Sequence, residues 1–232
     1  TGYQTYTILD TLFSNEITIA ETVQLNNIPL IEFKEITIDG EIDEGWEPSY
    51  DNTHSSNWGD SNNFENLYLA MDEKNLFIAV KGGFDSDGNT VNIYIDKDYG
   101  NGTGLNDFSV IDGGDYGSHL RKNINTSSDF GGDIAFTAWA LNHEMGVVSL
   151  ENESNVDQNI IEESNFVLEH NVIEFSVPFA VLYENGEIPF GEIIALVAVI
   201  GGGSEDSFAD DTIPQVEGGF TGRFSTVFSS SY

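Results

Sequence analysis

Short apolar stretches alternate with clusters of Gly, Asn and Asp along most of the chain. In residues 91–95, apolar side chains occupy every second position, which is the period of a β-strand with one buried face. Residues 76–80 form a continuous apolar run, as in a strand that is buried on both faces. Because such stretches are brief and turn residues separate them, the pattern predicts an all-β fold. The predicted strands lie at residues 17–25, 35–38, 67–71, 76–80, 91–95, 134–141, 144–150, 166–169, 172–177, 193–200 and 220–228.

This spacing of strands is typical of an antiparallel two-sheet β-sandwich of the jelly-roll or immunoglobulin-like kind. Helix signals are nearly absent, and residues 179–183 are the one predicted helical turn. Long polar loops are predicted at residues 51–63 and 112–132. Because no Pro/Ser-rich linker divides the chain, residues 34–232 are predicted to form one sandwich domain behind an N-terminal extension at residues 1–33.

The N-terminal extension carries apolar side chains with the spacing of a strand. Such a strand can pair with a sheet edge of its own subunit. It can also add to the sheet of a neighbouring copy, which would make the protein a homo-oligomer linked head to tail. The candidate residues of this assembly strand are Tyr3, Tyr6, Ile8, Leu9, Leu12, Ile17, Ile19 and Val23.

The chain is strongly acidic, with 40 Asp and Glu residues against seven Lys and Arg residues and a formal net charge of −33. Nucleic-acid binding needs clustered cations that neutralise phosphates, so the composition excludes that class of partner. The apolar run at residues 193–200 is too short for a membrane span, which needs ~20 residues. The acidity itself fits halophilic solvation, repulsion that keeps an exported protein soluble, or the binding of divalent cations.

Two acidic turns bring side-chain oxygens close together, as a hard cation requires. Calcium is the expected cofactor, because it prefers carboxylate and amide oxygens. Ordinary turn chemistry is the alternative, in which Asp and Asn side chains accept hydrogen bonds from their own backbone. The candidate metal ligands are Asp85, Asp87, Asn89, Asp96, Asp98 and Asp107.

Aromatic side chains in polar loops can stack against sugar rings. Trp58 is the first candidate for such a glycan contact, because it lies among polar neighbours in a predicted loop. Trp46 and Tyr50 are further candidates, although Trp46 lies where a core residue is also expected. For Trp58, the alternative is an aromatic side chain that folds back onto the sheet edge.

The sequence lacks the motifs of common catalytic sites. It contains no cysteine, which excludes disulfides, thiolate metal sites and cysteine nucleophiles. Its four histidines do not show the spacing of a zinc protease, and the segment around Ser204 lacks the final glycine of a nucleophile elbow. We therefore expect a non-catalytic protein.

Residues 36–46 read Ile-Thr-Ile-Asp-Gly-Glu-Ile-Asp-Glu-Gly-Trp, and further short motifs follow in a fixed order. Together they resemble the carbohydrate-binding-module family-nine-like domains, the group that includes the glucodextranase C-terminal module and lies near the DOMON sandwiches. The resemblance extends from Glu35 to Pro214, and it implies an exported, non-catalytic sandwich of two antiparallel sheets. The other matching segments are residues 66–72, 75–80, 93–98, 100–104, 130–133, 173–178 and 213–214.

Three N-x-[ST] sequons, at Asn101, Asn125 and Asn152, lie in polar stretches and are candidate glycosylation sites. The chain begins at Thr1 without an initiator methionine, which is typical of a secreted protein after removal of its signal peptide. We therefore expect an extracellular or cell-surface location.

Two functions are compatible with these features. The main hypothesis is a structural subunit of an extracellular or cell-surface filament or surface layer, assembled through the N-terminal strand. The other is a calcium-stabilised glycan-binding module for an extracellular polysaccharide. The N-terminal extension and an acidic surface that divalent cations could bridge favour the first, and the family resemblance favours the second.

The structural hypothesis predicts that the protein forms filaments or sheets at physiological salt with millimolar calcium. Deletion of residues 1–24 should abolish them, because the donated strand is then missing. Electron microscopy of both proteins measures this directly. Dispersed monomers in both samples would favour the glycan-binding module instead.

Overall fold

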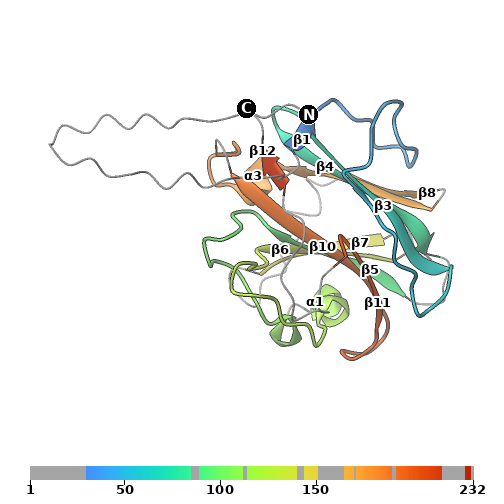
Figure 1. Ribbon diagram of the computed structural model, residues 1–232. Coiled ribbons are helices and arrows are strands. Elements are labelled where there is room, and N and C mark those ends of the chain that lie inside the picture. Colours follow the sequence, from blue (N-terminus) through green and yellow to red (C-terminus); the bar gives the residue numbers. More distant parts are fainter. Residues whose placement is uncertain are drawn as a thin grey trace, which may run out of the picture.

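The computed structural model describes residues 30–84, 89–111, 114–139, 144–150, 165–169, 171–189, 192–215 and 228–230. In this part of the chain, two β-sheets pack face to face (Figure 1), which confirms the predicted all-β sandwich. The β3–β4 sheet has the order β8 (Asn165–Glu169), β9 (Val172–Pro178), β4 (Asn75–Phe84), β3 (Asn62–Met71) and β1 (Leu30–Phe33), and β2 (Tyr50–Asp51) also pairs with β3. The β5–β10 sheet has the order β7 (Glu144–Ser149), β6 (Ile134–Trp139), β5 (Thr90–Asp96) and β10 (Ile193–Gly201), and β11 (Phe208–Ile213) also pairs with β10.

Two short strands join the sheets along one side of the sandwich. β12 (Phe228–Ser230) pairs antiparallel with β10 and parallel with β1, and β1 pairs parallel with β3. β1 occupies the last four residues of the predicted N-terminal extension, so these residues belong to the chain's own sandwich. The candidate assembly residues from Tyr3 to Val23 lie outside the described residues.

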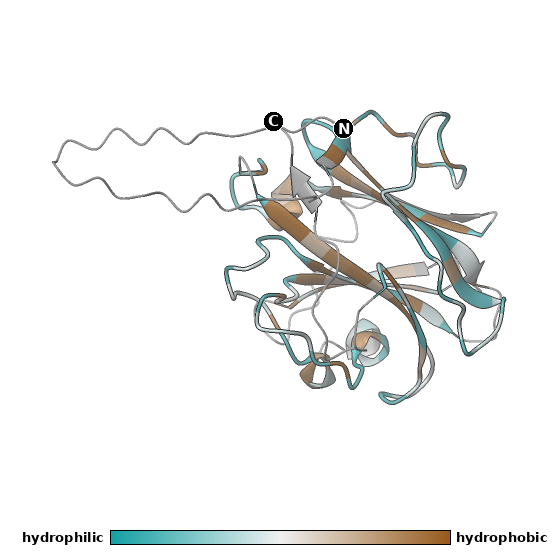
Figure 2. Ribbon diagram, in the orientation of Figure 1, coloured by the Kyte–Doolittle hydropathy of each residue, from teal (hydrophilic) through white to brown (hydrophobic). Residues whose placement is uncertain are grey.

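Alternate side chains of the two sheets meet in one continuous apolar core. The rings of Phe136 on β6 and Phe175 on β9 lie 4.9 Å apart and connect the two sheets. In β10 nearly every side chain is buried, because its outer face is covered as well as its inner face. Figure 2 shows this strand as one of the most hydrophobic elements of the fold.

Loop segments cover the outer faces of both sheets. Residues 36–46 cover the β3–β4 sheet, where Ile36 and Trp46 pack against Tyr68 and Phe77. Residues 99–130 cover the β5–β10 sheet and contain the 3-10 helix η1 (Phe108–Val110) and the helix α1 (Gly114–Leu120). Because these segments cover much of the outer faces in the described chain, the strand ends and the loops there are the places to examine for ligand-binding groups.

Three short segments can be compared with the secondary structure that the sequence predicts for them. The predicted helical turn at residues 179–183 is present as α3 (Phe179–Leu182). The alternation at residues 35–38 does not form a strand, because these residues cover the sheet and the backbone N–H groups of Asp39 and Gly40 bond to Glu174 instead. The helix α1 was predicted as loop, since two of its seven residues are glycines, which disfavour helix. None of the helices in the described residues is long and apolar enough to cross a membrane.

Candidate functional site

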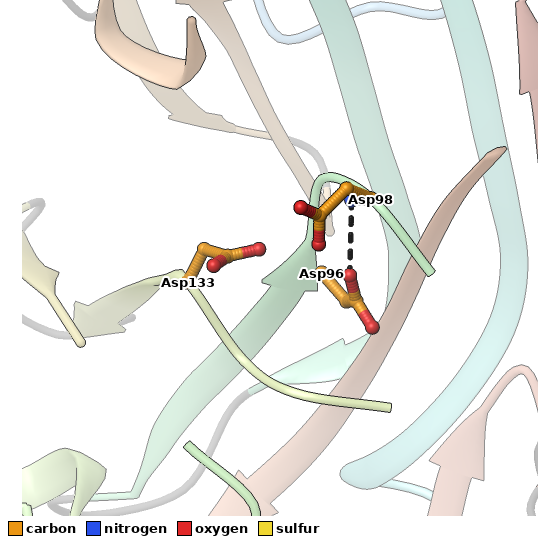
Figure 3. A group of neighbouring side chains, drawn as sticks. All are labelled: Asp96, Asp98 and Asp133. Atoms are coloured by element: carbon orange, nitrogen blue, oxygen red, sulfur yellow. Dashed lines mark hydrogen bonds between the residues drawn. The ribbon is translucent and has the colours of Figure 1, made fainter. Parts of the chain in front are cut away.

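Three aspartates converge at one end of the β5–β10 sheet. β5 ends at Asp96, the following turn carries Asp98, and Asp133 directly precedes β6. Because β5 and β6 are antiparallel neighbours, the end of the first strand lies beside the start of the second. One carboxylate oxygen from each aspartate lies within 4.8 Å of the others, and Figure 3 shows the three side chains close together at this end of the sheet. We call these three residues the carboxylate triad.

Backbone N–H groups fix the orientation of the two buried carboxylates. Asp96 accepts hydrogen bonds from the N–H groups of Asp98 and Gly131, with N···O distances of 3.0 and 2.9 Å. The Oδ2 atom of Asp133 accepts from the N–H of Lys97 at 2.9 Å. The other oxygen, Oδ1, is buried and has no hydrogen-bond partner among the described residues. Because an unpaired buried oxygen is costly, this atom is suited to accept a hydrogen bond or to bind a cation.

The triad places negative charges in a poorly solvated position. Burial, together with the charges of Asp133 and Asp98, raises the pKa of Asp96 to about 7, although the hydrogen bonds from the N–H groups of Gly131 and Asp98 oppose the shift. Burial likewise raises the pKa of Asp133 to about 6, although the N–H and the charge of Lys97 oppose the shift. Ionised carboxylates at this site therefore need more positive charge than Lys97 provides.

The triad has the donor atoms and the spacing for a hard cation. Oxygen ligands of Ca²⁺ lie about 2.4 Å from the ion, so two of them can be up to about 5 Å apart. The spacing of the triad oxygens satisfies this limit. The residues present could therefore hold a metal ion.

A tyrosine and a glutamate surround the triad. The hydroxyl of Tyr183, just after α3, donates to the backbone oxygen of Lys97 at 2.8 Å. Burial raises the pKa of Tyr183, and so do the charges of Glu192 and the three aspartates. Glu192, which precedes β10, thus adds a fourth negative charge near the site. A cation here would act on the end of β5, the start of β6 and the start of β10 together.

The sequence identified Asp96 and Asp98 but not Asp133 as a ligand. Asp98 follows Asp96 by two positions in one turn, whereas Asp133 reaches the site through the pairing of β5 with β6. The motif at residues 130–133 belonged to the family resemblance and was the only signal for Asp133.

Two further candidate metal ligands, Asp107 and Asn89, have other partners in the described chain. Asp107 accepts hydrogen bonds from the backbone N–H and the hydroxyl of Ser109 and begins the 3-10 helix η1. This is the turn chemistry considered as the alternative for the acidic loops. Asn89 donates to the side-chain oxygen of Asn62 at 2.9 Å. Asp85 and Asp87 lie outside the described residues.

The three aromatic candidates are all packed against apolar neighbours. Trp46 is only 3% exposed and lies against Tyr68, with ring centroids 5.6 Å apart, so its faces are closed to a sugar. Tyr50 on β2 is half-buried against the main core. Trp58 is also half-buried against this core, so only part of its ring is available for a contact.

The loop that carries Trp58 is tied to β11. The N–H of Asn57 donates to Asp210 at 2.9 Å, and the side-chain amide of Asn52 donates to the buried Asp211 at 2.7 Å. The tip of the Trp58 ring lies over Gly202, at the far end of β10 from the triad. The loop therefore folds back onto the sheet edge.

Two of the three sequons lie in the described chain. Asn101 and Asn125 are both exposed, and both belong to the segment that covers the β5–β10 sheet. Asn152 lies outside the described residues. Modification at the first two asparagines stays a prediction.

Comparison with solved structures identifies carbohydrate-binding modules. The chain is similar to a carbohydrate binding module family 9 (CBM9) from Caldicellulosiruptor kristjanssonii in complex with glucose, with 13% identity over 80% of this chain and 84% of that one and a TM-score of 0.45. A CBM9 structure from the same organism in complex with cellotriose matches with 12% identity over 80% of this chain and 82% of that one, also with a TM-score of 0.45. The sequence resembles the same module family, and at this identity the similarity concerns the fold alone. No protein-family model and no curated protein matches the chain.

The raised pKa values give a testable dependence of stability on pH. Asp96 and Asp133 titrate at about 7 and about 6 in the folded chain, against ~3.9 in an unfolded chain. Without a cation, the folded state holds protons that the unfolded state has released, so stability falls as the pH rises from about 4 to about 7. A bound cation opposes this loss by neutralising the ionised carboxylates. Calorimetry should therefore show a small calcium-induced rise in melting temperature at about pH 5 and a larger one at about pH 8. An equal rise at both pH values would contradict the argument.

Proposed function

We propose that the chain is a non-catalytic module that binds neutral glycans at the cell surface or outside the cell. Its sandwich is stabilised by a Ca²⁺ ion that Asp96, Asp98 and Asp133 hold. The observation that carries the proposal is the carboxylate triad, in which two side chains are almost fully buried and one buried oxygen has no hydrogen-bond partner.

The chemistry of the triad favours calcium over other metal ions. All three donors are carboxylates, whereas zinc and copper prefer His and Cys ligands. Mg²⁺ demands a near-ideal octahedron at about 2.0 Å and usually retains several waters. Ca²⁺ accepts irregular sets of six to eight oxygens, so it tolerates carboxylates whose orientation the backbone has fixed.

Three features support glycan binding as the role of the module. The order of motifs between Glu35 and Pro214 resembles that of carbohydrate-binding modules. The described chain leaves polar groups at its strand ends, where a neutral ligand can make hydrogen bonds. Exposed sequons at Asn101 and Asn125 also fit the exported location that such a module needs.

Assembly through the N-terminal strand stays a prediction. The residues that would form the donated strand lie outside the described chain, and β1 pairs within its own sandwich. A calcium-stabilised sandwich is compatible with assembly, so the truncation experiment remains the test of that hypothesis.

The variant Asp133→Asn tests the calcium site. It keeps the shape of the side chain and an acceptor for Lys97, but it removes one charge that the ion needs. Calcium at 100 times its Kd should stabilise the wild-type protein by about 2.7 kcal/mol, and it should stabilise the variant much less. In EDTA the variant should be at least as stable as the wild type, because it relieves the repulsion within the triad.

Thermal denaturation and isothermal titration with calcium measure both effects. The control is Asp129→Asn, which removes an exposed acidic side chain from the same segment and should leave the calcium response unchanged. A wild-type protein whose melting temperature is the same in calcium and in EDTA would refute the calcium site.

Affinity electrophoresis tests the glycan-binding role. Native gels containing soluble β-glucan, mannan or xylan should retard the protein, because each bound chain slows its migration. Glucose and cellotriose, the ligands of the two similar structures, should compete if the target is a β-glucan. Unretarded migration through all three polysaccharides would contradict the proposal.

A further inference from the structure

We infer that the Ca²⁺ ion also contacts the glycan directly, through two neighbouring hydroxyl groups of a neutral sugar that complete its coordination beside Asp98 and Thr103. The inference rests on the proposed calcium site, and it names where the proposed glycan ligand binds. It differs from a contact at Trp58, which lies at the other end of β10.

The triad alone leaves the coordination of the ion incomplete. Ca²⁺ takes six to eight oxygen ligands, whereas the triad offers one oxygen from each of three aspartates, all within 4.8 Å of one another. Both oxygens of Asp96 and the Oδ2 of Asp133 already accept backbone hydrogen bonds, which restricts these side chains to their present orientation. Roughly three to five positions on the ion are therefore left for water or for ligand oxygens.

One side of the site is open to solvent. Asp96 and Asp133 are 2% and 3% exposed, whereas Asp98 is only half-buried. The residues that follow it, 100–104, are all exposed. Side chains built at Gly100 or Gly102 would meet nothing within 4 Å, so the turn beside Asp98 is open at these two positions. The open positions of the ion can therefore be reached past Asp98.

The opening carries a hydroxyl group that is suited to a sugar. Thr103 donates a hydrogen bond from its side chain to Oδ1 of Asp98. The N–H of Asn101 donates to the backbone oxygen of the same aspartate at 3.1 Å, which holds the turn together. A sugar hydroxyl bound to the ion beside Asp98 can exchange hydrogen bonds with Thr103, as hydroxyls both donate and accept.

The charge of the surroundings selects the class of ligand. Three carboxylates, Lys97 and one Ca²⁺ together carry no net charge, but Glu192 adds a negative charge nearby and the chain as a whole carries −33. Anionic ligands such as uronates or phosphates are repelled from such a surface. Hydroxyl groups bring oxygen ligands without charge, so a neutral sugar is the ligand that fits.

Terbium luminescence tests the direct contact. Tb³⁺ replaces Ca²⁺ at oxygen sites, and its luminescence lifetimes in H₂O and D₂O report how many water molecules it binds. The full-length protein loaded with Tb³⁺ is titrated with cellotriose, mannotriose and galactotriose. For at least one sugar, saturation should displace about two coordinated waters, one for each hydroxyl that binds. Saturation with no change in coordinated water would overturn the inference.

Isothermal titration in calcium and in EDTA gives an independent result. Sugar binding should be lost in EDTA. Thr103→Val should weaken it about tenfold, the effect of one lost hydrogen bond near a charge, and Asp129→Asn should leave it unchanged. Binding that survives EDTA and Thr103→Val but is lost in Trp58→Ala would overturn the inference and leave the glycan-binding function intact. Calcium binding without any sugar binding would overturn both.

Discussion

The structure depends on how the chain accommodates three carboxylates at the end of β5. Asp96 and Asp133 are buried and held by backbone N–H groups, so they cannot turn away from each other. The hydrogen bond from Gly131 to Asp96 requires the backbone at Gly131 to lie close to that of Thr103. A Cβ atom at Gly131 would lie 1.6 Å from the backbone oxygen of Thr103, so only glycine fits there. Ionised carboxylates this close are stable only with a positive partner. The repulsion between these carboxylates and the oxygen atoms that could bind a neutralising cation therefore belong to the same three residues.

The covering segments decide where else the sandwich can bind a ligand. In many antiparallel sheets one face is exposed to solvent, but here residues 36–46 and 99–130 bury the outer faces. The second of these segments leads directly into the triad, because the N–H of Gly131, the residue that follows it, donates to Asp96. The segment that closes the face of the β5–β10 sheet thus ends next to the carboxylate triad.

The sequence predicted the features that depend on local patterns. Apolar patterns located the strands from β3 to β10 but missed β1, β2 and β11. The Asp96-Lys97-Asp98 turn was recognised because its two carboxylates are two residues apart. Asp133 is 37 positions from Asp96, and only the register of β5 with β6 brings it near. Asp107 is much closer to Asp96 along the chain than Asp133 is, yet its side chain bonds within its own turn. Spacing along the chain finds ligands within one loop, whereas strand pairing determines which loops meet.

The same register separates the two candidate contacts for a glycan. Asp96 pairs with Ala195 near the start of β10, whereas Thr90 pairs with Gly201 at its end, and the Trp58 ring lies over Gly202. With a rise of about 3.3 Å per residue, the triad and Trp58 are separated by roughly 20 Å along the strand. A single sugar unit cannot touch both. The Trp58 ring is packed against the core, whereas the side of the triad near Asp98 is exposed. Accessibility therefore favours glycan binding at the end of β10 that holds the carboxylates.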